Sequence, residues 1–245
     1  MRGRVAGCAA VLLMLLTGCG EGGSEAEAKP TRTPKPTAAP GVDGDADPGT
    51  VFTAAELTAA LLPAKAVGPK AKALNATSGV DGRLYGGGDW GACAPGKKAS
   101  TELFEMRGTT AGHMISPFPG ANADDEDPVL SQTLVSMPDA RAERHVELRR
   151  QLHKACPSVT VDTDAAPVVE HHAVEDLPDI GDEAILESKR YEGGDDYDAA
   201  TRYYKAEVRV GGVLVLVDAG PHKDLTISSA AKAAARVRTE LYKAS

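Results

Sequence analysis

The most reactive side chain near the start of the sequence is the thiol of Cys19. It follows an aliphatic residue and two small residues, in the order Leu16-Thr17-Gly18-Cys19. This order matches the bacterial lipobox, in which the thiol accepts a diacylglyceryl group and a peptidase then cleaves just before the cysteine. Two acyl chains hold a protein stably on a membrane, whereas one holds it only marginally. We therefore expect Cys19 to carry lipid and to become the first residue of the mature chain.

The segment before this cysteine has the charge and the length of a signal peptide. Arg2 and Arg4 precede an uncharged and almost wholly apolar stretch at 5–16. A membrane-spanning helix needs about 20 apolar residues, so this shorter stretch is more typical of a signal-peptide core. The sequence thus predicts a lipoprotein signal peptide at 1–18. The alternative is an ordinary secretory signal followed by a chance cysteine.

Export would place the remaining cysteines in an oxidising compartment. Cys8 leaves with the signal peptide, so Cys93 and Cys156 remain in the mature domain. We expect a disulfide between them, which would contribute on the order of 4 kcal/mol in the chain-entropy model. Free or metal-bound thiols are the alternative, but two distant cysteines without a CxxC motif are a poor zinc signal.

The sequence offers little that could perform catalysis. A nucleophile needs a base beside it, but the sequence has no GxSxG elbow, no HExxH motif and no P-loop. Ser116 lies in no recognisable context, and a disulfide would leave no free thiol. We therefore predict that the protein is not an enzyme, with no catalytic residue and no cofactor.

Histidines are the first candidates for metal binding. His171 and His172 are close to Glu170 and Glu175 in the sequence. Adjacent residues on a strand point to opposite faces, so both histidines could not ligate one metal without a bend. We interpret them as exposed strand residues, and His145 as a hydrogen-bonded boundary residue of a helix.

Two acidic runs and one tryptophan also allow two interpretations. The runs at 124–127 and 195–198 could collect calcium, but they are more typical of solvated loops. Trp90 lies among glycines shortly before Cys93, where packing over the disulfide is favoured over ligand binding. The sequence therefore predicts no metal site.

The acidic balance excludes some partners. The formal net charge is −8, and removing 1–18 takes away two arginines and no acidic residue. Nucleic-acid binding needs a basic surface, and so does lying flat on anionic lipid. We therefore predict no nucleic-acid partner.

Composition divides the mature chain into a linker and a domain. Residues 19–50 are rich in Gly, Glu, Ala, Thr and Pro, a composition that cannot bury a core. We expect a disordered linker there, partly in extended polyproline conformation. Residues 51–245 are long enough for a substantial core and are interpreted as one domain.

The first half of this domain reads as a helix followed by strands. Thr53 and Glu56 form a capping box, and Pro63 ends the helix. The stretch 71–105 alternates and breaks at glycine-rich turns, as short strands do. A further strand is expected at 129–137.

The second half begins with a helix at about 140–155, with Asp139 as its cap and Pro157 as its stop. Helical spacing places one polar and several apolar side chains on a single face. They are His145, Leu148, Leu152, Ala155 and Cys156. Cys156 should therefore point towards the core.

Strands at 183–190 and 201–210 lead into a hairpin, where two glycines can supply the positive φ of a tight turn. Five valines share one face of this hairpin: Val208, Val210, Val213, Val215 and Val217. Leu214 and Leu216 lie on the other face with Glu207 and Arg209, so that face is either covered by another element or lines a groove.

A last helix at 225–242 carries an alanine-rich stripe that would let it pack closely on the valine face. The stripe consists of Ile227, Ala230, Ala234, Val237 and Leu241. Helices and strands therefore alternate in groups. This order predicts an α+β fold with a mainly antiparallel sheet packed by helices and one disulfide.

Several of these stretches together resemble a known family. They are Lys154-Ala155-Cys156, Gly181-Asp182-Glu183-Ala184, the strand pair between Val208 and Val215, and the alanine-rich final helix. They resemble actinobacterial sensor-like lipoproteins, which look similar to the extracellular domain of the mycobacterial serine/threonine kinase H. The resemblance covers 51–245 and implies an α+β domain with a cleft for an unidentified ligand and no known catalysis. That kinase domain has two disulfides, whereas this chain can form one.

The leading functional hypothesis is a lipid-anchored, extracytoplasmic module with a non-enzymatic ligand-binding or sensor-like domain. Its expected partners are the bilayer, through acylated Cys19, and an unidentified small molecule or envelope protein. A structural or protein-interaction lipoprotein is the first alternative, favoured by a closed sheet with no pocket. An enzyme of unrecognised type is the second, favoured by a cleft where His171 or His172 meets a carboxylate and a hydroxyl.

Overall fold

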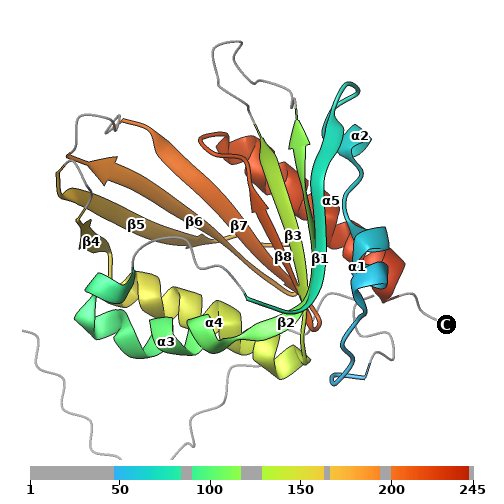
Figure 1. The fold of residues 1–245 in the computed structure, drawn as a ribbon, viewed down its shortest axis with the longest axis horizontal. Coiled ribbons are helices and arrows are strands. Elements are labelled where there is room, and N and C mark those ends of the chain that lie inside the picture. Colours follow the sequence, from blue (N-terminus) through green and yellow to red (C-terminus); the bar gives the residue numbers. More distant parts are fainter. Residues whose placement is uncertain (1–46, 84–89, 117–128, 163–165, 194–199, 243–245) are drawn as a thin grey trace, which may run out of the picture. The chain divides into compact units, whose positions relative to one another are not determined.

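One antiparallel sheet organises the part of the chain described by the computed structural model, which covers 47–83, 90–116, 129–162, 166–193 and 200–242. Within these ranges the sheet has eight strands in the order β1-β2-β3-β8-β7-β6-β5-β4 (Figure 1). They are β1 (Lys72–Arg83), β2 (Arg107–Ser116), β3 (Leu130–Ser136), β4 (Ser158–Val161), β5 (Val168–Asp176), β6 (Glu183–Glu192), β7 (Arg202–Val210) and β8 (Val213–Asp218).

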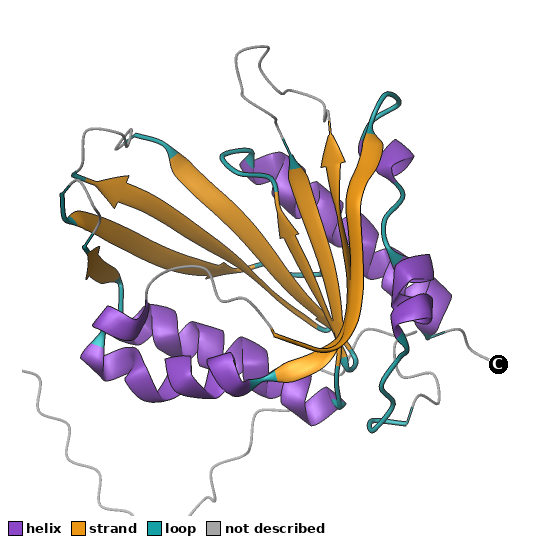
Figure 2. Cartoon of the chain, in the orientation of Figure 1, coloured by secondary structure: helices purple, strands orange, loops and turns teal. Residues whose placement is uncertain are grey.

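Helices cover both faces of this sheet (Figure 2). They are α1 (Ala54–Ala60), α2 (Ala64–Val67), α3 (Lys97–Glu105), α4 (Asp139–Ala155) and α5 (Lys223–Leu241), with short 3-10 turns η1 (Trp90–Ala92) and η2 (Ala94–Gly96). The predicted α+β class, with an antiparallel sheet packed by helices and one disulfide, is confirmed. The predictions for Cys19, the signal peptide, residues 19–46 and both acidic runs fall outside the described residues.

The larger core lies between the sheet and helices α1 and α5. The five hairpin valines are all buried in it, as their shared face predicts. Ala230, Ala234 and Val237 of α5 lie in the same core, so the small side chains of the stripe bring this helix close to the sheet. Burial of this apolar surface is the main stabilising contribution to the fold.

The second core lies on the opposite face, beneath α3 and α4. Leu214 and Leu216 are buried there against α4, together with Leu148 and Leu152. A helix therefore covers the two leucines, which excludes a groove at this position. Cys156 is fully buried in the same core, as its place on the helix face predicts.

The ends of several elements follow from local sequence. Thr53 and Glu56 form the predicted capping box at the start of α1. Gly211 has a φ of +53° in the turn between β7 and β8. Residues other than glycine adopt this backbone conformation with difficulty.

Three local predictions were wrong. Asp139 does not cap α4; Pro138 holds the N-cap position, and the Asp139 carboxylate accepts a hydrogen bond from Arg209 at 2.8 Å. Residues 97–105 form α3 rather than a strand, because good helix formers outweigh the weak alternation and Leu103 packs under α4. Strand β2 was missed, since its buried face includes the polar His113.

Candidate functional site

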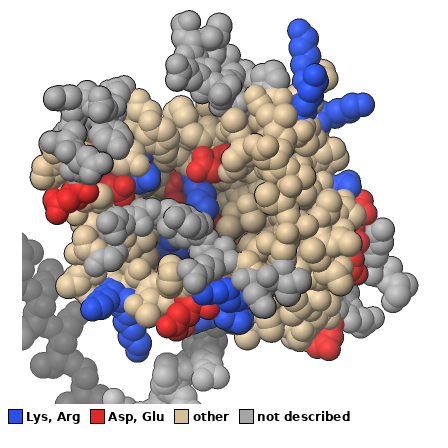
Figure 3. Space-filling model, in the orientation of Figure 1, with Lys and Arg blue, Asp and Glu red and all other residues tan. Residues whose placement is uncertain are grey.

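A pocket of about 90 Å³ lies on the α4 face of the sheet, over strands β5 to β8. It is lined by aromatic, basic and acidic side chains from six elements: Trp90, Arg149, His153, His172, Glu187, Ser188, Lys189, Tyr203, Tyr204, Lys205 and Asp218. Figure 3 shows basic and acidic side chains together in a recess on this face. Because regular strands and α4 hold most of these groups, the pocket is positioned by the rigid part of the fold.

The aromatic wall of the pocket is built around Trp90. Its ring centroid lies 4.2 Å from that of His172, in a tilted stack, and 5.1 Å from that of His153, edge to face. The guanidinium carbon of Arg149 lies 5.9 Å from the Trp90 centroid. Trp90 is 4% exposed, so its ring is packed as a wall and is not a mobile surface aromatic.

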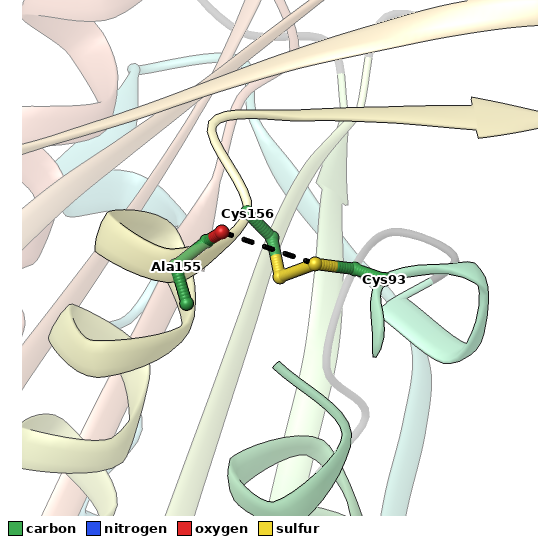
Figure 4. The surroundings of a disulfide bond; sticks show 3 residues. All are labelled: Cys93, Ala155 and Cys156. Atoms are coloured by element: carbon green, nitrogen blue, oxygen red, sulfur yellow. Dashed lines mark hydrogen bonds between the residues drawn. A yellow bond between two sulfur atoms is a disulfide. The ribbon is translucent and has the colours of Figure 1, made fainter. Parts of the chain in front are cut away.

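The disulfide holds this wall in place. Cys93 and Cys156 are bonded, as predicted, and join the turn that follows Trp90 to the end of α4 (Figure 4). The Cys93 sulfur also lies 4.0 Å from the Ala155 carbonyl oxygen. A side chain at Gly96 would collide with the Cys156 sulfur, so only glycine permits this close approach. Trp90 therefore lies in the same core as Cys156 and also lines the pocket. Packing near the disulfide and a place beside a ligand are thus compatible.

A buried ion pair forms the floor of the pocket. Arg149 donates to both carboxylate oxygens of Glu187, with Nε 2.5 Å from Oε1 and Nη2 bonded to Oε2. His153 Nε2 lies 2.9 Å from the same Oε1. Burial raises the pKa of Glu187, but the charge of Arg149, the hydrogen bond with His153 and the charge of Lys205 together hold that pKa below its usual range.

A second buried carboxylate lies behind the first. Glu207 is fully buried; its Oε1 is 2.5 Å from Lys205 Nζ, and its Oε2 is 3.0 Å from His145 Nε2. Burial would raise the pKa of Glu207, but Lys205 and Arg149 hold it well below the usual value. His145 is thus hydrogen-bonded, as predicted, although it is buried and does not lie at a boundary.

Two buried nitrogen atoms beside the pocket have no hydrogen-bond partner in the described part of the chain. Arg149 Nη1 and His153 Nδ1 are buried and have no hydrogen-bond partner among the described residues. Burial would lower the pKa of Lys189, but Tyr191 and Glu170 raise it above the usual value. Lys189 therefore carries a positive charge at the pocket, although its Nζ is 3.8 Å from the nearest Glu170 oxygen.

The rim of the pocket is more polar and more accessible. Tyr203 is 39% exposed. Asp218 lies directly across the ladder from Lys205, and its Oδ1 accepts the backbone N–H of Gly220 at 2.8 Å. Among the described residues no group of three or more His, Cys, Asp or Glu side chains could hold a metal ion.

The paired histidines point to opposite faces of β5, as strand geometry predicts. The prediction that both are exposed was wrong for His172, which is buried against Trp90 and lies 3.2 Å from Glu170. His171 is half-buried on the other face. Only His172 of the two therefore lines the pocket.

His171 takes part in a different polar arrangement. Its Nδ1 lies 2.9 Å from Ser158 Oγ, and its Nε2 lies 2.8 Å from Glu192 Oε2. A hydroxyl, an imidazole and a carboxylate in this order are the groups that a serine hydrolase uses. Glu192, however, is 60% exposed, Ser158 is exposed, and none of the three lines the pocket.

Most of the ionic residues of the pocket were missed. The signal was nevertheless present, because Glu207 lies on the same face of the β7–β8 hairpin as the buried Leu214 and Leu216 and so must be a buried carboxylate. A buried carboxylate needs a charged partner, and Arg149 lies one turn from His145 on the buried face of α4. Nothing in the local sequence indicates that Lys189 or Asp218 lines a pocket.

Comparisons with known proteins support the fold. No protein-family model and no curated protein matches the chain. The crystal structure of the extracellular domain of PknH from Mycobacterium tuberculosis is similar, with a TM-score of 0.53 and 19% sequence identity, over 78% of this chain and 100% of that one. The predicted resemblance is therefore confirmed at the level of the fold. In the described part of the chain, none of the helices combines the length and apolarity of a membrane span.

Proposed function

We propose that this chain is an extracytoplasmic lipoprotein whose domain binds a small polar molecule in the Trp90 pocket without transforming it. The observation that carries the proposal is the pocket itself, with a packed aromatic wall and charged groups fixed by a buried ion pair. Ligand sites commonly combine apolar walls with a few placed polar groups. The similar fold of an extracellular kinase domain is consistent with a sensor-like role.

A structural or interaction role has less support. It is favoured by a sheet without a pocket and by a continuous apolar surface. Of the large exposed apolar side chains among the described residues, Leu74 and Met114 are cross-strand partners, whereas Val51, Phe104 and Tyr203 come from separate segments. Single exposed apolar residues are normal on soluble domains.

An enzymatic role is tied to the Ser158–His171–Glu192 arrangement. Glu192 is exposed, and water screens exposed carboxylates, which weakens its effect on His171 and through it on the Ser158 hydroxyl. A hydrolase also needs donors that stabilise an oxyanion in a site shielded from water. We therefore interpret the arrangement as a cross-strand hydrogen-bond network at the edge of the sheet.

Ligand binding can be tested with the single tryptophan of the chain as an internal probe. The mature domain, purified from its native envelope, is analysed by native mass spectrometry for bound small molecules. A released molecule is then titrated back while Trp90 fluorescence is recorded. We expect saturable binding that Tyr203→Ala weakens and Phe104→Ala, an exposed substitution on α3, leaves unchanged. Absence of any bound molecule, or equal binding by both variants, would contradict the proposal.

Membrane anchoring is tested separately. We expect a radiolabelled fatty-acid precursor to label the full chain in its native cell, and Cys19→Ala to abolish the label. Release of the unlabelled variant from the membrane fraction would complete the test. Labelling that persists in Cys19→Ala would place the lipid elsewhere or exclude this anchor.

A further inference from the structure

The buried side of the pocket is richer in hydrogen-bond donors than in acceptors. The oxygens of Glu187 are occupied by Arg149 and His153, and those of Glu207 by Lys205 and His145. These carboxylates therefore have little capacity left for a ligand.

The cationic groups of Arg149 and Lys189 keep hydrogen-bonding capacity for a ligand. Arg149 is 2% exposed in its side chain, and its Nε and Nη2 are bound to Glu187, which leaves Nη1 without a partner. Lys189 Nζ interacts with Tyr191 and lies 3.8 Å from Glu170 Oε1, which is beyond hydrogen-bond distance. A buried guanidinium nitrogen without an acceptor is costly, so an acceptor bound in the pocket would stabilise the site.

Asp218 is the acidic group that lines the pocket at the end of β8. Its Oδ1 accepts the Gly220 N–H, and its position opposite Lys205 keeps a positive charge close to it. The pocket thus combines one rim carboxylate with donor groups of Arg149 and Lys189. This distribution suits a ligand whose negative end enters first.

We propose that the pocket binds a small oxyanion, a carboxylate or phosphate group, whose oxygens accept hydrogen bonds from Arg149 Nη1 and Lys189 Nζ. The inference rests on the proposed ligand-binding function and gives that ligand its chemical class. Arg149 presents planar, fixed donors that suit oxyanions, whereas Lys189 adds a point charge from the adjacent strand. Tyr203 at the rim is placed to contact the uncharged remainder of the molecule.

The test uses inorganic phosphate and acetate as probes, titrated into the mature domain at pH 7 with KCl holding the ionic strength constant. Acetamide is the uncharged counterpart of acetate, and methylammonium is the cationic control. Because Trp90 is the single tryptophan, its fluorescence reports the pocket directly. We expect a saturable change with phosphate and acetate, and none with acetamide or methylammonium.

The matched variants are Lys189→Gln and Lys154→Gln, since Lys154 is an exposed lysine of α4 outside the pocket. We expect Lys189→Gln to raise the apparent Kd of phosphate by about tenfold or more, as for loss of one charged hydrogen bond, and Lys154→Gln to leave it unchanged. A linear, non-saturable response, equal Kd values for the two variants, or saturation by methylammonium would overturn the oxyanion assignment. A neutral molecule recovered from the native protein would overturn it while leaving the binding function intact.

Discussion

Arg149 of α4 and Glu187 of β6 are joined by two parallel hydrogen bonds at the buried floor of the pocket. Their side chains are 2% and 7% exposed. The pair fixes the position of the helix over the sheet, because sliding α4 would separate two buried charges. The same pair orients the guanidinium that faces the pocket.

Arg149→Met should lower the free energy of unfolding by about 3–5 kcal/mol, since it leaves Glu187 buried without its cation. Urea unfolding followed by circular dichroism measures the loss. Arg149→Met combined with Glu187→Leu should recover most of it, because an apolar pair of similar volume avoids the stranded charge.

The matched control for that experiment is Arg144→Met on the same helix. Arg144 bonds Glu102 and Glu147 at the surface, where ion pairs contribute little. We expect almost no change in its urea midpoint. Equal losses for Arg144→Met and Arg149→Met would show that burial of the Arg149 pair has no special role.

Acid should destabilise the domain through Glu187 and Glu207. Their folded-state pKa values lie below the ordinary value of 4.5, so the unfolded chain takes up protons first. Stability is therefore fully present above about pH 4.5 and is lost as the pH falls through the folded-state pKa values. Unfolding free energies measured from pH 6 to 3 should fall less steeply in the Arg149→Met and Glu187→Leu double variant than in the wild type.

A second pH effect should arise from His113 on the other side of the sheet. Burial lowers the pKa of His113 below its ordinary value of 6.5. The unfolded chain is then protonated first, so stability is present above about pH 6.5 and declines below it. We expect His113→Gln to flatten the dependence of unfolding free energy on pH between 7.5 and 5.5; parallel curves for the two proteins would refute this.

Removing the disulfide should loosen the aromatic wall. Cys93→Ser with Cys156→Ser is expected to lower the unfolding free energy by about 2–5 kcal/mol. The Trp90 emission maximum should move to longer wavelength, because the turn that carries the ring loses its bond to α4. An unchanged emission spectrum in the folded variant would show that packing alone holds Trp90.

The exposed serine network should be chemically inert. We expect a fluorophosphonate probe to leave Ser158 unmodified, with mass spectrometry of the digested protein as the measurement. Modification of Ser158 that disappears in His171→Gln would contradict the non-enzymatic assignment and indicate an activated serine.

Sequence patterns were informative where burial is apolar and regular. The valines of the hairpin and the alanine stripe of α5 are as predicted, and so is the buried face of α4 with Leu148, Leu152 and Cys156, except that Ala155 is exposed. Each of these features depends on the spacing of apolar residues within one continuous segment, and that spacing can be seen in a single sequence. Helix α3 was missed although its apolar residues lie on one face, because it is short and buries a single large side chain, Leu103.

The pocket was harder to predict for a physical reason. Arg149 and Glu187 are 38 residues apart in the chain and lie on different elements. Their pairing depends on how α4 crosses the sheet, which no local pattern indicates. Lys189 and Asp218 are ordinary charged residues until the strand order brings them to one recess. Periodicity can therefore indicate that a charge is buried, but not which distant charge accompanies it.

The strand order also bears on how the chain folds. Strands β1 to β3 and β4 to β8 are two consecutive runs in which each strand pairs with its sequence neighbour, and the runs meet where β3 pairs with β8. Hairpins form quickly because their contacts are local, whereas contacts between distant segments slow folding. The Leu134–Val215 junction, formed across that meeting line, should therefore be the last pairing to develop and the step that limits the rate of folding.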